Sequence, residues 1–200
     1  MVQPYQNNDY PPPASVRNLY PEDLRTVGER NDEQAWALAE DWLRNYNRWT
    51  YHATGPDADP GRGLVLYGPV GTGKTSIAAA WINHIARDLG LSVAFVTDGE
   101  WARMFRFRWR ESDIDDQLLR LERLSCVVID DLLRQGTQRE PTEIEAIIRQ
   151  RWNHGLPTIV TLNSGVSLPD PLRSFLREFT WCYFEGKDLR DPATIEKLTA

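Results

Sequence analysis

GLVLYGPVGTGKT, residues 63–75, is the stretch that decides the fold of this chain. Its first part, GLVLY, is a short apolar run that predicts a buried strand. Its second part, GPVGTGKT from Gly68 to Thr75, fits the pattern G-x-x-x-x-G-K-[ST] and leads into a helical pattern. A strand, a glycine-rich turn and a helix in this order predict a phosphate-binding loop, because glycines let backbone N–H groups approach phosphate oxygens at a helix start.

This loop predicts a binding site for ATP and Mg²⁺. Lys74 is expected to reach the β- and γ-phosphates, and the Thr75 hydroxyl is expected to bind Mg²⁺. The backbone of the whole stretch is expected to surround the phosphates. Its residues are Gly68, Pro69, Val70, Gly71, Thr72, Gly73, Lys74, Thr75 and Ser76.

Polar side chains at the ends of two later apolar runs extend this predicted site. CVVIDD ends in Asp130, placed to hold Mg²⁺, and Asp131, placed to orient or deprotonate the attacking water. TIVTLN ends in Asn163, at the strand end where open α/β sheets bind ligands, so its amide is expected to bond the γ-phosphate or the water. Two alternatives stay open: the acids can be the solvated end of a strand, and Asn163 can cap the following segment.

Outward from the loop, strand and helix patterns alternate. Strands are expected within residues 91–97, 124–130, 157–162 and 180–186. An amphipathic helix before the loop is expected from a capping box of Asn31 and Gln34 to about Trp49. Together they predict an α/β P-loop fold, with about five mostly parallel strands and helices on both faces. The helices after the loop are expected to begin near Lys74, Asp98, Asp113, Pro141 and Asp170.

Composition and charge restrict the classes of function. The chain has 200 residues, a formal net charge of −6 and no apolar run long enough to cross a bilayer. Cys126 and Cys182 lie within expected strands, without the spacing of a metal or disulfide framework. These features predict a soluble protein of the cytoplasm. The acidity also argues against binding of duplex DNA by charge over the whole surface.

One segment departs from this acidity. WARMFRFRWR, residues 101–110, contains four arginines and no acid. On a helix, Arg103, Arg106 and Arg110 share one face and predict contacts with the phosphates of single-stranded DNA. Phe107 and Trp109 lie off the main apolar stripe and are expected to stack on bases.

The same helix carries a second stripe. Trp101, Met104, Phe105 and Arg108 share another face, and its aromatic and methionine side chains are expected to pack on the sheet. Asp98 is expected to cap this helix. For the arginine face, two alternatives stay open: a solvated surface, or a patch that docks an acidic protein partner.

The order and spacing of several motifs resemble the ATPase module of the DnaC/IstB group of AAA+ proteins, the bacterial and phage helicase loaders. The resemblance covers approximately residues 19–186 and implies an AAA+ ATPase domain over 18–186, with a lid domain that is reduced or absent. Residues 1–17 are expected to form an extended or disordered arm, because they lack apolar periodicity, and 187–200 a tail. The motifs are GRGLVLYGPVGTGKTSIAAAW, VVIDDL, EAIIRQRW, PTIVTLN and LRSFLREF.

The resemblance also implies self-association in ATP, with an arginine of one protomer completing the site of its neighbour. Arg177, and Arg173 as second choice, lie on the helix before the last strand, where this family places such an arginine. The alternative is that both arginines only solvate that helix. Arg139 matches an arginine of loader relatives. Asp131 stands where most AAA+ ATPases have glutamate, which implies slower hydrolysis.

The function that the resemblance implies is that of an ATP-dependent helicase loader. Such a protein binds single-stranded DNA and a replicative ring helicase when DNA replication is initiated, and its ATPase is slow and stimulated by oligomerisation or DNA. Three alternatives stay open. They are a transposition helper ATPase of the IstB type, an adaptor that binds ATP with little hydrolysis, and a small-molecule kinase.

Overall fold

The computed structural model describes residues 10–51, 63–107, 113–133 and 140–191. Its centre is a sheet of five strands in the order β2-β3-β4-β1-β5, in which every neighbouring pair is parallel. The predicted α/β class is confirmed. The strands are β1 (Gly63–Gly68), β2 (Val93–Thr97), β3 (Cys126–Asp130), β4 (Thr158–Asn163) and β5 (Thr180–Tyr183).

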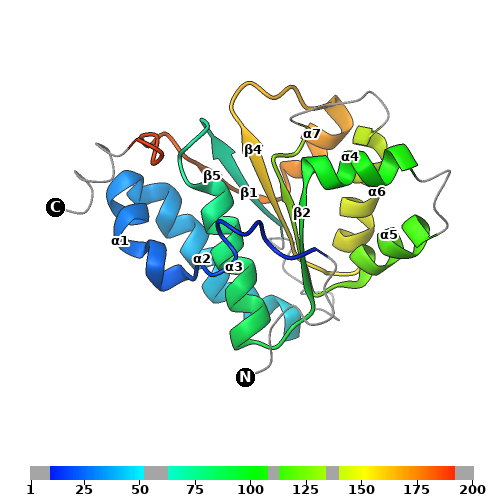
Figure 1. Cartoon of the computed structure of the whole chain (residues 1–200), viewed down its shortest axis with the longest axis horizontal. Helices are drawn as coiled ribbons and strands as arrows, with labels where there is room; N and C mark the ends of the chain where they lie inside the picture. Colours follow the sequence, from blue (N-terminus) through cyan, green and yellow to red (C-terminus); the bar gives the residue numbers. More distant parts are fainter. Residues whose placement is uncertain (1–9, 52–62, 108–112, 134–139, 192–200) are drawn as a thin grey trace.

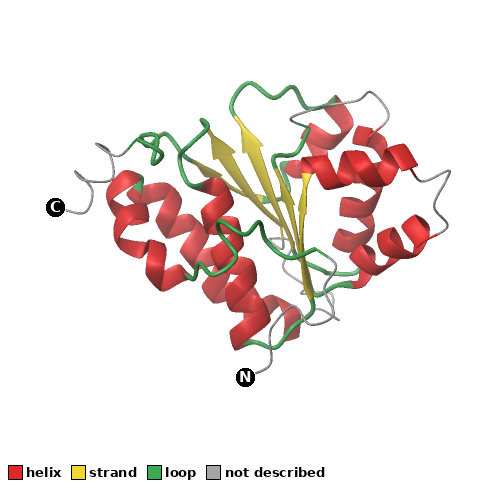
Figure 2. Ribbon diagram, viewed as in Figure 1, coloured by secondary structure: helices red, strands yellow, loops and turns green. Residues whose placement is uncertain are grey.

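Helices cover both faces of this sheet (Figures 1 and 2). One face carries α1 (Pro21–Asn31), α2 (Glu33–Tyr51) and α3 (Lys74–Asp88). The other carries α4 (Asp98–Phe107), α5 (Asp113–Arg123), α6 (Glu140–Asn153) and α7 (Asp170–Leu176). Because all strands run the same way, their carboxyl ends meet along one edge, the upper edge in Figure 1. None of the helices described is long and apolar enough to span a membrane.

The alternation of side chains along the strands divides the core in two. In β1, Leu64 and Leu66 pack toward α2 and α3, whereas Val65 packs toward α4–α7. The first half of the core is anchored by Trp36 and Trp81, whose rings meet edge to face at 5.2 Å between centroids. Burial of an aliphatic side chain such as Leu64 or Val65 contributes about 1.5–3 kcal/mol to folding, so both layers stabilise the sheet.

Two helix starts differ from the sequence prediction. α2 begins after Asp32, and not at a box formed by Asn31, because the Asp32 carboxylate accepts a hydrogen bond from a first-turn N–H at 3.2 Å. α4 is capped by Thr97 instead of Asp98. The Glu100 N–H donates to Thr97 Oγ1 at 3.4 Å, and the Thr97 N–H donates to Glu100 Oε2 at 2.7 Å, which forms a capping box.

The segment before α1 lies against the domain. The Phe95 N–H, on edge strand β2, donates to the Tyr10 carbonyl at 2.8 Å. Buried Asn83 of α3 donates to the carbonyls of Arg17 and Leu19 at 2.9 and 2.7 Å. Tyr10 therefore bonds to the outer edge of β2 and Arg17 lies against α3, although the sequence places both residues in an extended arm. α1 has no counterpart among the helices expected from the sequence.

At the opposite end of the sheet, one buried arginine closes two turns. Arg151 of α6 is fully buried and donates to the carbonyls of Leu121, Leu124 and Pro157 at 2.6, 2.8 and 2.6 Å. It also donates to Thr158 Oγ1 at 3.0 Å. Because buried carbonyls need donors, this guanidinium ties the ends of α5 and α6 to the starts of β3 and β4.

Candidate nucleotide-binding site

The loop between β1 and α3 has the backbone geometry of a phosphate cradle. Gly71 and Gly73 have φ angles of 88° and 94°, in the left-handed region that other residues disfavour. The Thr72 hydroxyl donates to the Pro69 carbonyl at 3.0 Å and holds the turn closed. α3 begins at Lys74, so the first N–H groups of the helix face the loop and add positive potential there.

Lys74 lies folded into this loop. Its Nζ donates to the carbonyls of Gly68 at 2.9 Å and Pro69 at 2.6 Å. Burial lowers the pKa of Lys74, while the carboxylates of Asp131 and Asp130 raise it. The ammonium group therefore lies over the loop, with Asp130 and Asp131 nearby, in a position from which it can bind a phosphate.

Asp130 ends β3 beside the start of α3. Its Oδ1 accepts hydrogen bonds from Thr75 Oγ1 at 3.0 Å and Thr161 Oγ1 at 2.7 Å. Burial raises the pKa of Asp130, the Thr161 bond lowers it, and the nearby Asp131 charge raises it. The two residues expected to bind Mg²⁺ are thus in direct contact, and carboxylate and hydroxyl oxygens are donors that this ion accepts.

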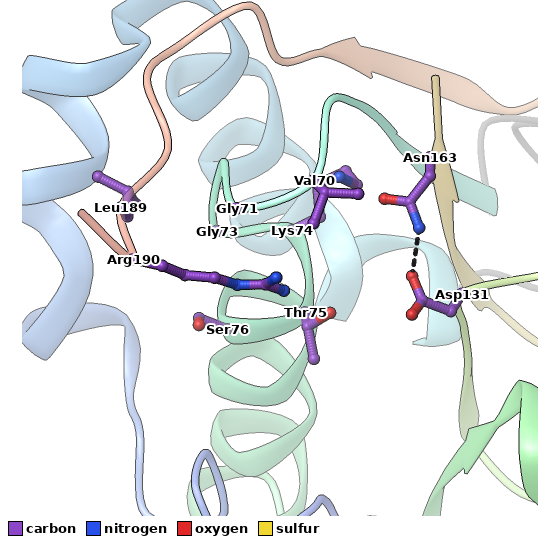
Figure 3. Close-up of a pocket in the computed structure, with 10 residues that line it drawn as sticks. All are labelled: Val70, Gly71, Gly73, Lys74, Thr75, Ser76, Asp131, Asn163, Leu189 and Arg190. Carbon is purple, nitrogen blue, oxygen red and sulfur yellow. Dashed lines mark hydrogen bonds between the residues drawn. The ribbon is translucent and has the colours of Figure 1, made fainter. Parts of the chain in front are cut away.

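Asp131 and Asn163 also meet at this edge of the sheet. The Asp131 backbone has a φ of 56°, a left-handed conformation that aspartate tolerates better than most residues. Its N–H donates to Thr161 Oγ1 at 2.8 Å, and its Oδ1 accepts a bond from Asn163 Nδ2 at 2.7 Å (Figure 3). Asn163 pairs with Gly68 in the register of β4 and β1, so this carboxylate–amide pair faces the loop.

The substitution Asp130→Asn is expected to stabilise the protein without nucleotide. Because the pKa of Asp130 is raised by folding, the native state binds this proton more tightly than the unfolded chain, and stability falls as pH rises through that interval. A neutral amide removes this cost. The melting temperature at pH 7 should rise by about 2–4 °C for each kcal/mol removed. The gain should vanish below about pH 4, where the unfolded carboxyl is also protonated.

Calorimetric melting of both proteins at about pH 7 and about pH 3 checks this result. Asp191→Asn serves as the matched control, because it removes the same charge from an exposed position. A lower melting temperature for Asp130→Asn at pH 7 would contradict the argument.

These groups line a cavity of about 170 Å³ (Figure 3). Its walls come from the loop, the start of α3, the ends of β3 and β4 and the segment after β5. The sequence predicts all of its lining residues except Leu189 and Arg190. They are Val70, Gly71, Gly73, Lys74, Thr75, Ser76, Asp131, Asn163, Leu189 and Arg190.

A second cavity, of about 240 Å³, adjoins the first and is mainly apolar. It shares Gly73, Ser76 and Leu189 with the first cavity. An apolar pocket beside a phosphate cradle has the chemistry of a nucleobase site. Its other lining residues are Leu24, Val27, Gly28, Asn31, Asp32, Trp36, Thr72, Ile77 and Phe184.

Several of these site residues are not expected from the sequence. Thr161 could have been identified from the sequence, because a hydroxyl group inside an otherwise apolar strand needs a hydrogen-bond partner. Leu189 and Arg190 have no such local signal. They reach the loop only because the chain turns back after β5, where the Leu189 N–H donates to the Gly71 carbonyl at 2.8 Å.

The two arginines expected to act on a neighbour do not line the cavity of their own chain. Arg173 Nη2 donates to the Leu168 carbonyl at 2.8 Å, and its Nη1 lies 3.4 Å from Asp170 Oδ1. Arg177 follows α7 with an exposed side chain. Arg139 falls outside the described residues.

α4 carries the described part of the arginine-rich segment. The packing of its apolar stripe is confirmed: Trp101 and Met104 are buried, and Phe105 stacks on Trp101 with 5.7 Å between centroids. Arg103 is exposed on the same helix. The remaining predicted contacts are not described: the side chains of Arg106 and Phe107 in α4, and all of Arg108, Trp109 and Arg110 beyond it.

Comparison with known proteins identifies a family that matches the central part of the chain. The family described as IstB-like ATP binding protein matches residues 58–168. The replicative helicase loader DnaI of Bacillus subtilis (strain 168) is 24% identical over 136 residues, which cover 66% of this chain and 39% of the loader. The chain thus spans well under half the length of that curated relative.

Solved structures share the fold at low identity. A replication initiator DnaA, bound to AMPPCP and single-stranded DNA, has a TM-score of 0.72 at 18% identity over 94% of this chain and 56% of its own. A crystal structure of DnaI has a TM-score of 0.61 at 18% identity, covering 89% of this chain and 94% of its own. The DnaC helicase loader has a TM-score of 0.54 at 20% identity, covering 92% and 100%.

Proposed function

The chain belongs to the family of IstB-like ATP-binding proteins, and from this premise we propose that it is a Mg²⁺-dependent ATPase that loads a replicative helicase. The observation that carries the ATPase proposal is the meeting of Lys74, the Thr75–Asp130 pair and the Asp131–Asn163 pair around the loop. The similarity to the DnaI helicase loader supports the role in initiation of DNA replication.

In the proposed reaction, the loop N–H groups and Lys74 bind the β- and γ-phosphates. Thr75 and Asp130 would hold Mg²⁺, which when bound neutralises charge on those phosphates. Asp131, oriented by Asn163, positions a water in line with the γ-phosphorus and accepts its proton. The water oxygen forms the new bond to phosphorus, the bond to the bridging oxygen breaks, and ADP and phosphate are released.

The adjoining apolar cavity is the proposed site of the adenine ring. Leu24 and Val27 of α1 form part of its wall, and Trp36 of α2 lies beside them. Burial of a flat ring there would add an apolar contribution to the charge contacts at the phosphates. This assignment makes α1, which has no predicted counterpart, a part of the nucleotide site.

Self-association in ATP completes the proposed mechanism. The cavity of one chain lacks Arg173 and Arg177, and the exposed Arg177 side chain is available to a neighbouring copy. Arg173 is the second candidate, because its guanidinium is already bonded to Leu168 and near Asp170. An arginine supplied in this way stabilises the negative charge that develops during phosphoryl transfer.

Single-stranded DNA is the proposed ligand of the arginine-rich segment. The triple substitution of Arg103, Arg106 and Arg110 by alanine should weaken oligonucleotide binding and leave ATP binding intact. Three phosphate contacts on a single strand predict a log–log salt slope near −2, which the triple variant should flatten. Phe107 and Trp109 are proposed to stack on bases, each contributing about 1–3 kcal/mol.

Fluorescence anisotropy with a single-stranded oligonucleotide, over a salt series, measures this slope. Arg44→Ala, Arg87→Ala and Arg149→Ala combined remove the same charge elsewhere and serve as the control. Unchanged affinity of the segment variant at every salt concentration would reassign the segment to a protein interface.

The loader proposal is tested with a purified replicative ring helicase and circular single-stranded DNA. In ATP, the protein should increase the amount of helicase retained on the circle, since a closed ring cannot thread onto a strand without ends. No increase with any cognate ring helicase would contradict the proposal. Full loading by an Asp131→Asn variant would instead indicate an adaptor that needs ATP binding alone.

A transposition helper is the second candidate, because the matched family is described by its likeness to IstB. Such a helper should bind duplex DNA in ATP at least as well as single strands. Competition between duplex and single-stranded oligonucleotides separates the two functions.

A further inference from the structure

Two threonines lie in the otherwise apolar strand β4, one near each end. Thr158 and Thr161 are both buried. Because side chains alternate along a strand, Thr161 lies on the same face of the sheet as Ile159, which packs toward α2 and α3. A buried hydroxyl among apolar side chains is unfavourable unless it is hydrogen-bonded. The partners of Thr161 therefore indicate what its hydroxyl does.

The Thr161 hydroxyl joins the two acids at the end of β3. Its Oγ1 donates to Asp130 Oδ1 at 2.7 Å and accepts a bond from the Asp131 N–H at 2.8 Å. A hydroxyl has one hydrogen and two lone pairs, so both bonds can form at once. The Thr161 carbonyl accepts a further bond from the Leu132 N–H at 3.0 Å. Thr161 thus holds Asp130, Asp131 and Leu132 in place.

These bonds form where the regular pairing of β3 with β4 ends. The two strands pair in register as far as Ile129 and Val160. Beyond that point Asp131 has a φ of 56°, a left-handed conformation that is unfavourable without support from the surrounding structure. The bond from its N–H to Thr161 stabilises this turn of the backbone. The turn in turn directs the Asp131 carboxylate to the amide of Asn163, at 2.7 Å.

The same hydroxyl also orients the Asp130 carboxylate. Asp130 Oδ1 accepts one bond from Thr161 and a second from Thr75 Oγ1 at 3.0 Å. Two bonds to one oxygen restrict the rotation of the carboxylate group. Asp130 and Thr75 are the proposed Mg²⁺ ligands, whereas Thr161 is fully buried and does not line the cavity. Thr161 is therefore placed to orient a ligand without being one.

We propose that Thr161 is a positioning residue of the ATPase site, whose hydroxyl orients the Asp130 carboxylate for Mg²⁺ and the Asp131 carboxylate for the attacking water. This inference rests on the proposed function, because it takes both acids to act on ATP and Mg²⁺. Thr161 touches neither of these and acts only through its two partners. Groups that orient metal ligands typically change metal affinity or activity by about 10–100-fold when they are removed.

The first test measures ATP binding with and without Mg²⁺. Thr161→Val keeps the shape of the side chain and removes the hydroxyl, so ATP binding in Mg²⁺ should weaken by about tenfold. Binding without Mg²⁺ should stay within about twofold, because the loop and Lys74 are unchanged. Thr161→Ser keeps the hydroxyl and should match the wild type within about threefold in both conditions. Titration calorimetry in Mg²⁺ and in a chelator measures these affinities.

Thr158→Val is the matched control. Thr158 lies on the same strand, is also buried, and accepts a bond from Arg151 Nε at 3.0 Å, at the end of β4 away from the site. This variant should lower the melting temperature as Thr161→Val does, because each loses a buried hydrogen bond. It should leave ATP binding in Mg²⁺ and ATP hydrolysis unchanged. Equal loss of ATP binding in both variants would indicate a general loss of stability and overturn the inference.

The serine and valine variants also separate positioning from packing. Serine lacks the methyl group of Thr161 and keeps its hydroxyl, whereas valine does the opposite. If the side chain only fills space in the core, Thr161→Ser should be impaired and Thr161→Val should behave as the wild type. That order of the two variants would contradict the proposed role.

The second test determines whether Thr161 acts through Asp131. At saturating ATP and Mg²⁺, Thr161→Val should lower the rate of hydrolysis by about tenfold or more. In an Asp131→Asn background it should have no further effect, because the carboxylate that the hydroxyl orients is already absent. Release of labelled phosphate over long incubations measures these low rates. The same fractional loss in both backgrounds would mean that Thr161 does not act through Asp131, and would overturn the proposal.

Failure of this inference and failure of the proposed function give different results. If the wild-type protein neither binds nor hydrolyses ATP, the proposed function is wrong. If it does both, and Thr161→Val equals it in Mg²⁺, Thr161 has no positioning role. Should Thr161→Val not fold, Thr161→Cys takes its place, because a thiol is a weaker donor and acceptor than a hydroxyl. It should show a smaller loss in the same assays, and wild-type values for it would overturn the inference.

Discussion

Arg177→Ala and Asp131→Asn proteins, each nearly inactive alone, are expected to hydrolyse ATP when mixed. In the Arg177→Ala protein the site of each protomer is intact and lacks only the arginine of its neighbour. In the Asp131→Asn protein the arginine is present, but the water has lost its base. One interface of the mixture combines the intact site with the intact arginine, so hydrolysis returns there.

The expected loss of activity in Arg177→Ala is large because the arginine stabilises negative charge in the transition state of phosphoryl transfer. An arginine supplied across an interface typically raises the rate of hydrolysis by about 10³–10⁵. The ATPase rate of the Arg177→Ala protein should therefore be lower than that of the wild type by at least about a thousandfold. In an equal mixture about a quarter of head-to-tail interfaces pair the two required surfaces, and the recovered rate should approach that fraction of the wild-type rate. Phosphate release at a series of mixing ratios measures it.

Arg173→Ala is the matched control for this experiment. Its guanidinium is bonded to the Leu168 carbonyl within its own chain, and its loss should cost much less activity than loss of Arg177. Both Arg177→Ala and Asp131→Asn should still bind ATP, because neither removes the loop or Lys74. If both bind ATP and no ratio restores hydrolysis, the sites are not shared.

Lys74→Ala is expected to abolish measurable ATP binding while the protein stays folded. The ammonium is the buried cation of the cavity, and its bonds to phosphate oxygens are charge-assisted and partly shielded from water. Their loss should weaken binding by about 100-fold or more. Calorimetric titration with Mg²⁺ and ATP measures the difference.

The protein should stay folded after this change, because the buried charge of Lys74 lowers the stability of the folded state. Burial lowers the pKa of its ammonium, which means that the folded environment disfavours the charge. The substitution removes the unfavourable burial of a charge, but two loop carbonyls lose their hydrogen-bond donor. These two effects oppose each other, so the melting temperature should change little. Lys187→Ala is the control, because it removes an exposed side chain and keeps the bonds between Asn31 and the backbone of residue 187. ATP affinity equal to wild type in Lys74→Ala would refute the site.

The stretch around Gly68 was sufficient to predict the loop because its chemistry is local. The residues that shape the cradle, Gly68 to Thr75, are consecutive in the sequence. Their glycine conformations and the helix start beside them follow from local sequence and do not need contacts with distant residues. The same reasoning predicted that the polar ends of β3 and β4 face the loop, since parallel strands bring their carboxyl ends to one edge. Asp131 and Asn163 do meet there.

Sequence periodicity also predicted the parallel sheet and the burial of Trp101 and Met104, because both follow from repeating apolar patterns. It was wrong about two caps. Asp32 and Thr97 take the places expected for Asn31 and Asp98, since several neighbouring residues can cap and the local backbone chooses among them.

The remaining parts of the site depend on contacts between distant residues. Leu189 donates a hydrogen bond to Gly71, and Lys187 donates one to Asn31, although the two residues of each pair are far apart in the chain. No periodicity or local motif encodes where an irregular segment turns back, because its course is set by the side chains it meets. The sequence by itself therefore determined the cradle, the sheet and the polar strand ends. Only the tertiary structure decided which segment closes the cavity and which cation it brings there.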